Sequence, residues 1–303
     1  MMEAYIDRSR GAFLGLATGD ALGAPVEFTR RGEFPLVTDM KPGGYFNLPK
    51  GAWTDDTAMA LCLADSLLED PGLNITDLMD RFLRWIDLAE NTSTGKAIGL
   101  GQNTIFVLGH YRRSGALEAP YIKGKSDGNG SIMRLAPIAC AYWRETDLAR
   151  SLAIKQSRAT HASALASSAC DFLALVLCEL IKGSSFEEAL NLGSKYKFEP
   201  EVLAIAQGLW AQKSMQEVKS GGFVIDTLEA ACWCIWHSDS FESALIKAVN
   251  LGHDADTVAA VTGQIAGALY GADAIPKRWL DDLVQKDKIL NKVEALMKIR
   301  NLK

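Results

Sequence analysis

Two short acidic segments combine carboxylates with hydroxyl groups directly before long apolar segments. They are WTDDT at residues 53–57 and GHDADT at residues 252–257. Aspartate and threonine are common at helix starts, because their oxygens accept free backbone N–H groups and a negative charge suits the helix dipole. One cap, however, needs only one side chain. Four carboxylates at two buried helix starts would repel one another in a low-dielectric interior unless a cation neutralised them.

The ligand chemistry of these segments indicates which cation would bind. Carboxylate and hydroxyl oxygens favour Mg²⁺ or Mn²⁺ over zinc, and four acids could hold two such ions. Neither segment continues as an EF-hand loop. A zinc site at His253 is an alternative, but no second histidine stands four residues away. For either segment taken alone, simple helix capping also remains open.

Composition narrows the class of protein. The chain has 303 residues, 48% of them hydrophobic, and a formal net charge of −5. This length is ample for a core without disulfide or metal support. Phosphate binding normally appears as clustered Lys and Arg, which are scattered here, so a nucleic-acid partner is not expected. A small-molecule substrate fits the net negative charge and the scattered basic residues better.

The cysteines and the apolar segments predict a cytoplasmic protein. The six cysteines form no CxxC pair and lie mostly in apolar surroundings, which is typical of reduced core thiols. The first ten residues lack the apolar stretch of a signal peptide. Residues 162–181 are long enough to span a bilayer, but they include two acids and several serines. We therefore expect a buried helix there and no membrane partner.

Helical periodicity dominates the chain. Residues 74–88 alternate apolar and charged faces at helical spacing, whereas 57–68 and 258–270 are apolar on nearly every face and should be central. Further helices are expected at 131–143, 147–158, 162–182, 199–213, 226–237, 240–250 and 288–300. No alternating strand pattern with hairpin turns occurs. The sequence therefore predicts an all-α fold, with residues 1–303 forming one compact domain whose long loops, rich in Gly and Pro, build a site.

Six motifs, in order along the chain, carry a resemblance to a known family. They are GAFLGLATGDALGAPVEF at 11–28, WTDDTAMAL at 53–61, DGNGSIMR at 127–134, ATHAS at 159–163, GGFV at 221–224 and GHDADTVAAVTGQIAGALYG at 252–271. The chain resembles the ADP-ribosylglycohydrolase family, particularly the bacterial type that activates dinitrogenase reductase. The resemblance implies an all-α hydrolase that uses two Mg²⁺ or Mn²⁺ ions. Its substrate would be an ADP-ribosylated protein or a small-molecule ADP-ribose conjugate.

The resemblance also implies the roles of individual residues. The metal ligands would be Thr54, Asp55, Asp56, Asp254, Asp256 and Thr257. The catalytic residues would be Glu27, Asp55, Asp56 and Asp254, with Glu27 or an aspartate receiving a proton from the attacking water. Taken alone, Glu27 could equally be a solvated acid in a loop.

The loop SDGNGS precedes an apolar segment and could bind a diphosphate, because glycines allow close approach and a helix start offers unpaired N–H groups. The same letters also suit an ordinary turn. Within the resemblance, the substrate-binding residues are Ser126, Asp127, Gly128, Asn129, Gly130, Ser131, His161, Gly222 and Phe223. Phe223 stands where relatives often place a tyrosine, and a core role is the alternative for it.

One position departs from the family pattern. In the segment STGKAIGLG at 93–101, several relatives carry an aspartate where this chain has Gly99. That aspartate is associated with the base or with a substrate guanidinium, so its absence leaves the cleaved linkage open. Two other functions also remain as alternatives. One is a protein of the same fold that only binds ADP-ribose, and the other is a metal-dependent phosphohydrolase, which would need more than the four histidines present.

Overall fold

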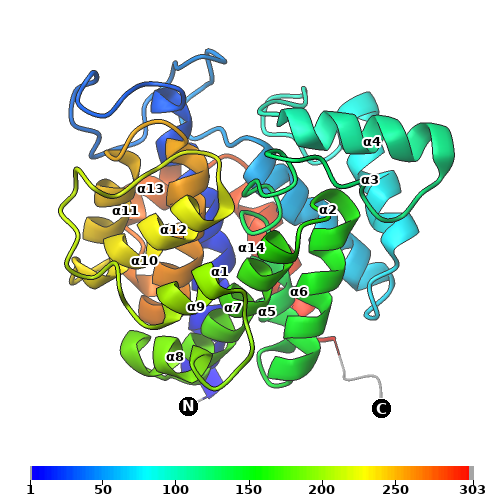
Figure 1. Cartoon of the computed structure of the whole chain (residues 1–303). Coiled ribbons are helices and arrows are strands. Elements are labelled where there is room, and N and C mark those ends of the chain that lie inside the picture. The colour runs from blue at the N-terminus through cyan, green and yellow to red at the C-terminus, as the bar shows by residue number, and fades with distance from the viewer. Residues whose placement is uncertain (1, 300–303) are drawn as a thin grey trace.

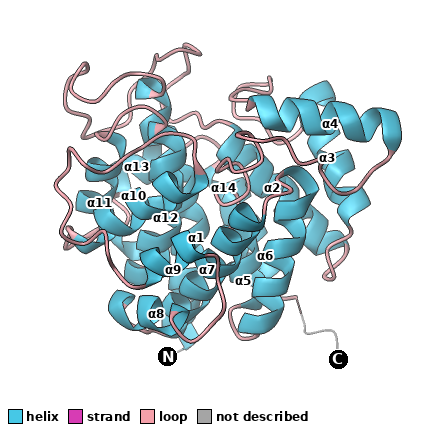
Figure 2. Cartoon of the chain, viewed as in Figure 1, coloured by secondary structure: helices cyan, strands magenta, loops and turns pink. Residues whose placement is uncertain are grey.

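The computed structural model describes residues 2–299, and this part of the chain consists of helices and loops. Figure 2 shows helices throughout and no strand among these residues. Two isolated bridges join Gly43 to Leu48 and Gly128 to Phe223. The predicted all-α fold is confirmed.

Fourteen α-helices and two short 3₁₀ helices make up the described chain (Figure 1). The first half contains α1 (Met2–Gly23), η1 (Ala24–Val26), α2 (Asp55–Glu69), α3 (Ile75–Leu88), α4 (Gln102–Ser114), α5 (Ala136–Tyr142) and α6 (Thr146–Thr160). The second half contains α7 (Ala164–Lys182), α8 (Phe186–Gly193), α9 (Pro200–Ala206), α10 (Val224–Trp236), α11 (Phe241–Val249), α12 (Ala255–Tyr270), η2 (Ala272–Ala274), α13 (Lys277–Asp282) and α14 (Lys286–Leu296).

The closest helix pair in the fold joins α1 to α12, which are more than 230 residues apart in sequence. A glycine recurs at every fourth position of α1, at residues 11, 15, 19 and 23, and therefore lies on one face of the helix. A Cβ added to Gly15 would lie 2.1 Å from the carbonyl oxygen of Gly263, and one added to Gly267 would lie 1.9 Å from that of Gly11. The two backbones are thus in direct contact, which no larger residue would permit.

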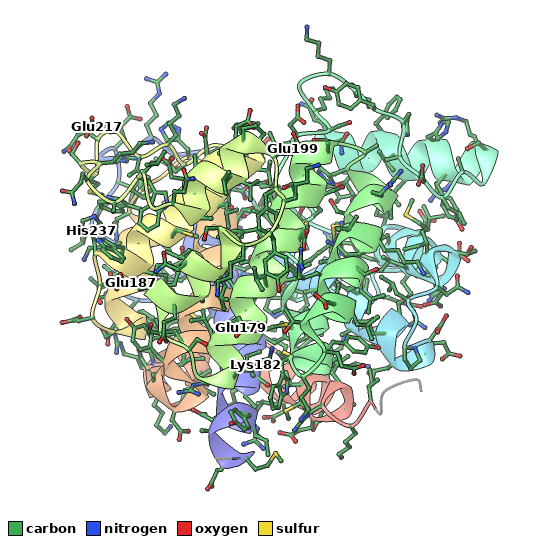
Figure 3. All side chains as sticks on the ribbon, turned by 60° about the horizontal axis from the view of Figure 1, so that its bottom comes forward. Glu179, Lys182, Glu187, Glu199, Glu217 and His237 are labelled. Carbon is green, nitrogen blue, oxygen red and sulfur yellow. The ribbon has the colours of Figure 1, made fainter. Side chains whose placement is uncertain are left out.

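The long apolar helix α7 lies within the protein core. By length and hydropathy it could cross a bilayer, but 72% of its apolar window is buried among the other helices. Near its end, Lys182 donates to Glu179 at 2.8 Å, and both side chains, labelled near each other in Figure 3, are partly exposed. This is the arrangement expected of a core helix that reaches the surface at one end.

Several helix bounds differ from the expectations. The helix expected over 131–143 begins only at Ala136, and the preceding residues form turns. Pro137 explains this start, because proline lacks an N–H group and is favoured in the first helical turn. The helix expected over 199–213 ends at Ala206. Helices 57–68 and 258–270 are largely buried, as expected, but the main partner of α12 is α1, whose glycine-rich sequence gave no amphipathic signal.

The contact between α1 and α12 generates a stability prediction. Alanine normally favours a helix over glycine by about 1 kcal/mol. Gly15→Ala should nevertheless lower the free energy of unfolding by about 2 to 3 kcal/mol, because its methyl group would overlap the backbone at Gly263. Urea unfolding followed by circular dichroism measures the change.

Gly109→Ala is the matched control within α4. Its nearest neighbour would be the flexible end of Arg113 at 3.4 Å, so this variant should be as stable as wild type or more so. Equal stability of Gly15→Ala and wild type would contradict the assigned backbone contact.

Candidate active site

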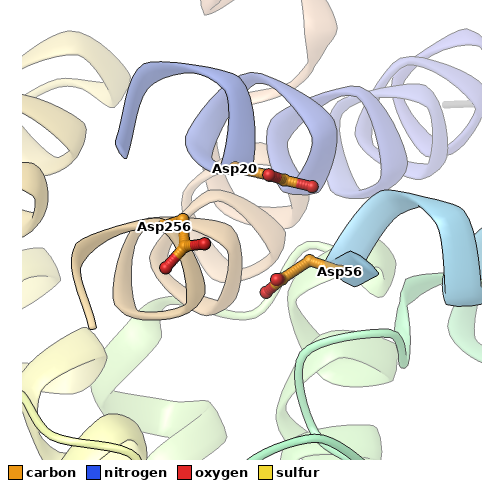
Figure 4. Close-up of side chains that lie close together, drawn as sticks. All are labelled: Asp20, Asp56 and Asp256. Atoms are coloured by element: carbon orange, nitrogen blue, oxygen red, sulfur yellow. The ribbon is translucent and has the colours of Figure 1, made fainter. Parts of the chain in front are cut away.

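Three helices that are distant in sequence each bring one aspartate to a common point. Asp20 comes from the C-terminal part of α1, Asp56 from the first turn of α2 and Asp256 from the first turn of α12. Their carboxylate oxygens lie within 4.8 Å of one another, and all three side chains are buried. Figure 4 shows the three side chains close together, each on a different helix. The two acidic segments therefore meet in space.

Asp20 was not predicted as a site residue, yet it organises the start of α2. One of its oxygens accepts from the backbone N–H and hydroxyl of Thr54, both at 2.8 Å. The other accepts from the N–H of Thr57 at 3.0 Å and from its hydroxyl at 2.6 Å. Asp20 thus satisfies free N–H groups of α2 from another helix. The available signal was a single charged residue in the otherwise uncharged segment 11–23 of α1, where an unpaired charge is costly.

A second group of acids adjoins the first and consists of Glu27, Asp254 and Asp256, again with oxygens within 4.8 Å. Backbone pairing holds the two segments together. The N–H of Phe28 donates to the carbonyl of His253, and the N–H of His253 donates to the carbonyl of Thr29, both at 2.7 Å. This pairing places Glu27, which follows the short helix η1, beside the start of α12. Asp256 belongs to both groups.

Weaker contacts join the two predicted acidic segments directly. The Thr54 hydroxyl lies 3.4 Å from a carboxylate oxygen of Asp256, and the Thr257 hydroxyl lies 3.5 Å from one of Asp56. The six predicted metal ligands are therefore close together, although Thr54 makes its shortest bonds to Asp20. Asp55 is also buried and faces the adjacent cavity.

Burial and mutual repulsion make this site unfavourable for negative charge. Burial first, and then neighbouring carboxylates, raise the pKa values of Asp55, Asp56 and Asp256 well above their ordinary range. The same two causes raise the pKa of Glu27 to about 11. One oxygen of Asp56 and one of Glu27 are buried without a hydrogen-bond partner. Unpartnered, crowded carboxylate oxygens are the ligands that a hard divalent cation requires.

His253 lies outside both acid groups, with its side chain exposed. Its backbone φ of 59° lies in the left-handed region, which non-glycine residues seldom adopt. Its N–H and carbonyl take part in the pairing described above. The zinc alternative therefore finds no support in the placement of this residue.

A cavity of 1090 Å³ opens beside the acids. Its walls include Glu27, Asp55, Asp254 and Asp256, the loop around Gly128–Gly130, and the segment 97–104. Backbone hydrogen bonds tie one wall together, because the N–H of Asn129 donates to the carbonyl of Gly222 at 3.0 Å. The Asn129 amide also donates to Asp254 at 2.6 Å. Asn129 therefore orients an acid as well as lining the cavity.

The predicted substrate-binding residues divide into two sets. Gly128, Asn129, Gly130, His161 and Gly222 line the cavity. Ser126, Asp127 and Ser131 instead form hydrogen bonds within the protein. The Ser126 hydroxyl accepts from the N–H of Ile122 at 2.8 Å, and Asp127 accepts from the Ser163 hydroxyl at 2.5 Å. The Ser131 hydroxyl accepts from the Ser157 hydroxyl at 2.9 Å. Phe223 is 41% exposed and lies next to the cavity wall rather than in it.

The fold also explains why position 99 is glycine. Gly99 has a φ of +82°, and a Cβ at this position would lie 2.1 Å from a carboxylate oxygen of Asp55. The loop backbone therefore rests directly against Asp55. An aspartate could occupy position 99 only if this backbone changed its conformation.

Comparison with known proteins assigns the family. A family model described as ADP-ribosylglycohydrolase matches residues 1–302. The chain belongs to this family. It is 44% identical over 293 residues to the ADP-ribosylarginine hydrolase Tri1 of Serratia proteamaculans, a match that covers 96% of this chain and 79% of that protein. It is 34% identical to the ADP-ribosyl-[dinitrogen reductase] glycohydrolase of Rhodospirillum rubrum, covering 98% of this chain and 97% of the relative.

A solved structure supports the same assignment. The solved chain titled ADP-ribosylglycohydrolase-related protein complex is 42% identical to this chain, and the two superpose with a TM-score of 0.86. The match covers 98% of this chain and 99% of the solved chain. The resemblance noted from the motifs is confirmed, and the chain is a glycohydrolase enzyme. This assignment disfavours both the phosphohydrolase and the member of the fold that only binds ADP-ribose.

The crowded acids generate a prediction about cation binding. Millimolar Mg²⁺ or Mn²⁺ should raise the melting temperature of the glycohydrolase, because a cation that binds only the folded state relieves the repulsion between carboxylates. At a hundredfold excess over Kd the gain would be about 2.7 kcal/mol. Asp256→Asn, which removes the acid shared by both groups, should abolish most of this gain.

Differential scanning fluorimetry with and without cation provides the measurement. Asp147→Asn is the control, because that side chain is 91% exposed and belongs to neither group. A wild-type melting temperature that does not respond to either cation would refute a metal role for these acids.

Proposed function

We propose that this glycohydrolase removes ADP-ribose from modified arginine side chains of proteins and uses a binuclear Mg²⁺ or Mn²⁺ centre. The observation that carries the proposal is the pair of carboxylate groups that share Asp256 beside a large cavity. Two groups with one common member suit two adjacent cations. The identity and number of the ions belong to this proposal.

The residues that would hold the cations are Asp56, Asp256, Asp254, Asp55, Thr54 and Thr257, with Asp20 supporting them from α1. Divalent cations would supply positive charge that orients ribose hydroxyls and acidifies water. The buried oxygens of Asp56 and Glu27 that lack partners support this fit.

The protein side chains would then manage position and proton transfer. Glu27 is buried beside Asp256 and has one free oxygen, so it can accept the proton of the attacking water. Burial and then the neighbouring carboxylates raise its pKa, and cations bound to those carboxylates would remove the second cause and so lower this pKa. Asn129 fixes the carboxylate of Asp254 through its amide.

Two observations bear on the linkage. Relatives named ADP-ribosylarginine hydrolase are 44% and 38% identical over nearly the whole chain, whereas the ADP-ribosylhydrolase ARH3 of Homo sapiens is 26% identical. Gly99 lacks the carboxylate that several relatives carry, but Asp55 already places an oxygen in the space before it. A carboxylate oxygen that could accept a hydrogen bond from a guanidinium is therefore retained at this wall.

The expected place of action is the cytoplasm. All six cysteines are free and buried in the described structure. Burial raises the pKa of the Cys62 and Cys170 thiols to about 12 and about 11, so they remain protonated at neutral pH. Inert, reduced core thiols suit a reducing compartment, where ADP-ribosylated proteins would be the substrates.

Turnover on a defined panel tests this function. The enzyme should release ADP-ribose from an ADP-ribosyl-arginine peptide faster than from an ADP-ribosyl-serine peptide or O-acetyl-ADP-ribose, and chelation should stop the reaction. Asp256→Asn should lower kcat by at least about a hundredfold, because it removes charge at the reacting site. Asp147→Asn should retain wild-type turnover.

A preference for the serine or O-acetyl substrate would overturn the arginine assignment while leaving the hydrolase intact. Full activity of Asp256→Asn, or full activity in the presence of a chelator, would overturn the metal centre. Binding of ADP-ribose without turnover of any panel member would contradict the hydrolase itself.

A further inference from the structure

Arg134 is a fully buried arginine whose partners are neutral. Its Nε donates to the side-chain oxygen of Gln156 at 2.7 Å, and its Nη2 donates to the Gln156 carbonyl at 3.0 Å and to the Thr160 hydroxyl at 2.8 Å. Its guanidinium lies 4.8 Å from the ring centroid of Phe82. Within residues 2–299, no carboxylate forms an ion pair with it. Arg134 is also absent from the walls of the cavity, so its role must come through its neutral partners.

The other hydrogen bond of the Gln156 side-chain amide fixes which of its atoms faces Arg134. The Gln156 side-chain nitrogen donates to the carbonyl of Ser131 at 3.0 Å, which leaves the Gln156 side-chain oxygen to accept from Arg134. An arginine offers only donors. Every bond from the guanidinium therefore has a known direction.

That direction determines where the Thr160 hydrogen goes. The Thr160 oxygen accepts from Arg134, so its single hydrogen is free for another acceptor. Nδ1 of His161 lies 2.9 Å from the same hydroxyl oxygen. This hydroxyl makes no other hydrogen bond among the described residues, so the arrangement that uses its hydrogen donates it to Nδ1 and leaves Nδ1 as the unprotonated nitrogen of the imidazole. In the neutral ring the remaining proton is on Nε2.

Nε2 is the ring nitrogen beside the cavity loop. His161 is 2% exposed and lines the cavity. A Cβ added to Gly128 would lie 3.4 Å from Nε2, and one added to Gly130 would lie 2.8 Å from Cε1. Glycines at these two positions allow the loop to rest on the ring. Within the described chain, Nε2 has no protein hydrogen-bond partner.

The electrostatic surroundings agree with a neutral ring. Burial and the positive charge of Arg134 lower the pKa of His161 to about 3. The arginine thus acts on the histidine in two ways, through its charge and through the hydroxyl that it orients. The charge keeps the ring neutral, and the hydroxyl contact at Nδ1 favours the remaining proton on Nε2.

We propose that Thr160, oriented by Arg134, is a positioning residue that holds His161 as the Nε2–H tautomer, so that the ring donates a hydrogen bond to a ligand oxygen in the cavity. A phosphate or ribose oxygen has the required acceptor chemistry, and only this last step rests on the proposed function. A neutral donor binds such an oxygen without placing a mobile proton beside the acids.

The tautomer can be measured without activity or ligand. Long-range ¹H–¹⁵N correlation spectra of ¹⁵N-histidine-labelled protein at pH 7 should show Nδ1 of His161 at a pyridine-type shift and Nε2 at a pyrrole-type shift. The signal is assigned by its absence from His161→Asn. Pyrrole-type Nδ1 in wild type would overturn the proposal.

Two substitutions at Thr160 separate positioning from packing. Thr160→Val keeps the shape but removes the hydroxyl, so the ring should lose its single tautomer and ADP-ribose binding measured by calorimetry should weaken about tenfold. Thr160→Ser restores the hydroxyl and should restore both readouts. An unchanged His161 spectrum in Thr160→Val would contradict the proposed positioning of His161 by Thr160.

The wild-type spectrum decides the tautomer even if Thr160→Val fails to fold. The Nε2–H tautomer in a wild-type protein that does not bind ADP-ribose would mean that the proposed function is wrong, while the positioning of His161 by Thr160 and Arg134 is correct. Equal ADP-ribose affinity in wild type and in folded Thr160→Val would show that the Nε2–H group does not contact the ligand, and would overturn that part of the proposal.

Discussion

The direct backbone contact between α1 and α12 is the constraint on which the site depends. The glycine face of α1 extends to Gly23, where an added Cβ would lie 2.5 Å from the Cα of Asp256. The same contact that joins the two helices therefore reaches the acid cluster. Asp20 lies on α1 one turn before Gly23, and it holds the start of α2 through Thr54 and Thr57. Helix packing and acid placement are thus one arrangement.

The helix packing holds buried carboxylates close together although their charges repel one another. Buried carboxylates normally separate, find donors or take up protons. Asp20 has four donors from α2, and Asp254 has the amide of Asn129, but one oxygen of Asp56 has none. The backbones of α1 and α12 cannot move apart without losing their core contact. Proton uptake, in line with the raised pKa values of these acids, and cation binding are the two remaining ways to lower the energy of the folded site, so any cation bound here would also stabilise the fold.

Site residues could be predicted from the sequence where several acids stood close together along the chain. They could not be predicted where a single residue acts through partners that are distant in sequence. The TDD and DADT segments stood out because capping could not explain four acids, and the structure brings them together. Asp20 was missed because a single aspartate in a mostly apolar segment has no evident role until its partners Thr54 and Thr57 are known. The start of the helix after SDGNGS was placed too early because apolar periodicity outweighed Pro137. The inward positions of Ser126 and Ser131 depend on tertiary contacts with Ile122 and Ser157, which no local pattern encodes.

The site therefore separates two kinds of charge that would otherwise cancel. Arg134 is a buried cation near an acidic site, and Asp55 is among the groups that favour its charged form. A direct ion pair between them would neutralise an acid that is needed for cation binding. Gln156 and Thr160 instead hold the guanidinium by neutral hydrogen bonds, away from the carboxylates. The acids therefore remain unpaired with the arginine, whose guanidinium donates instead to the Thr160 hydroxyl beside His161.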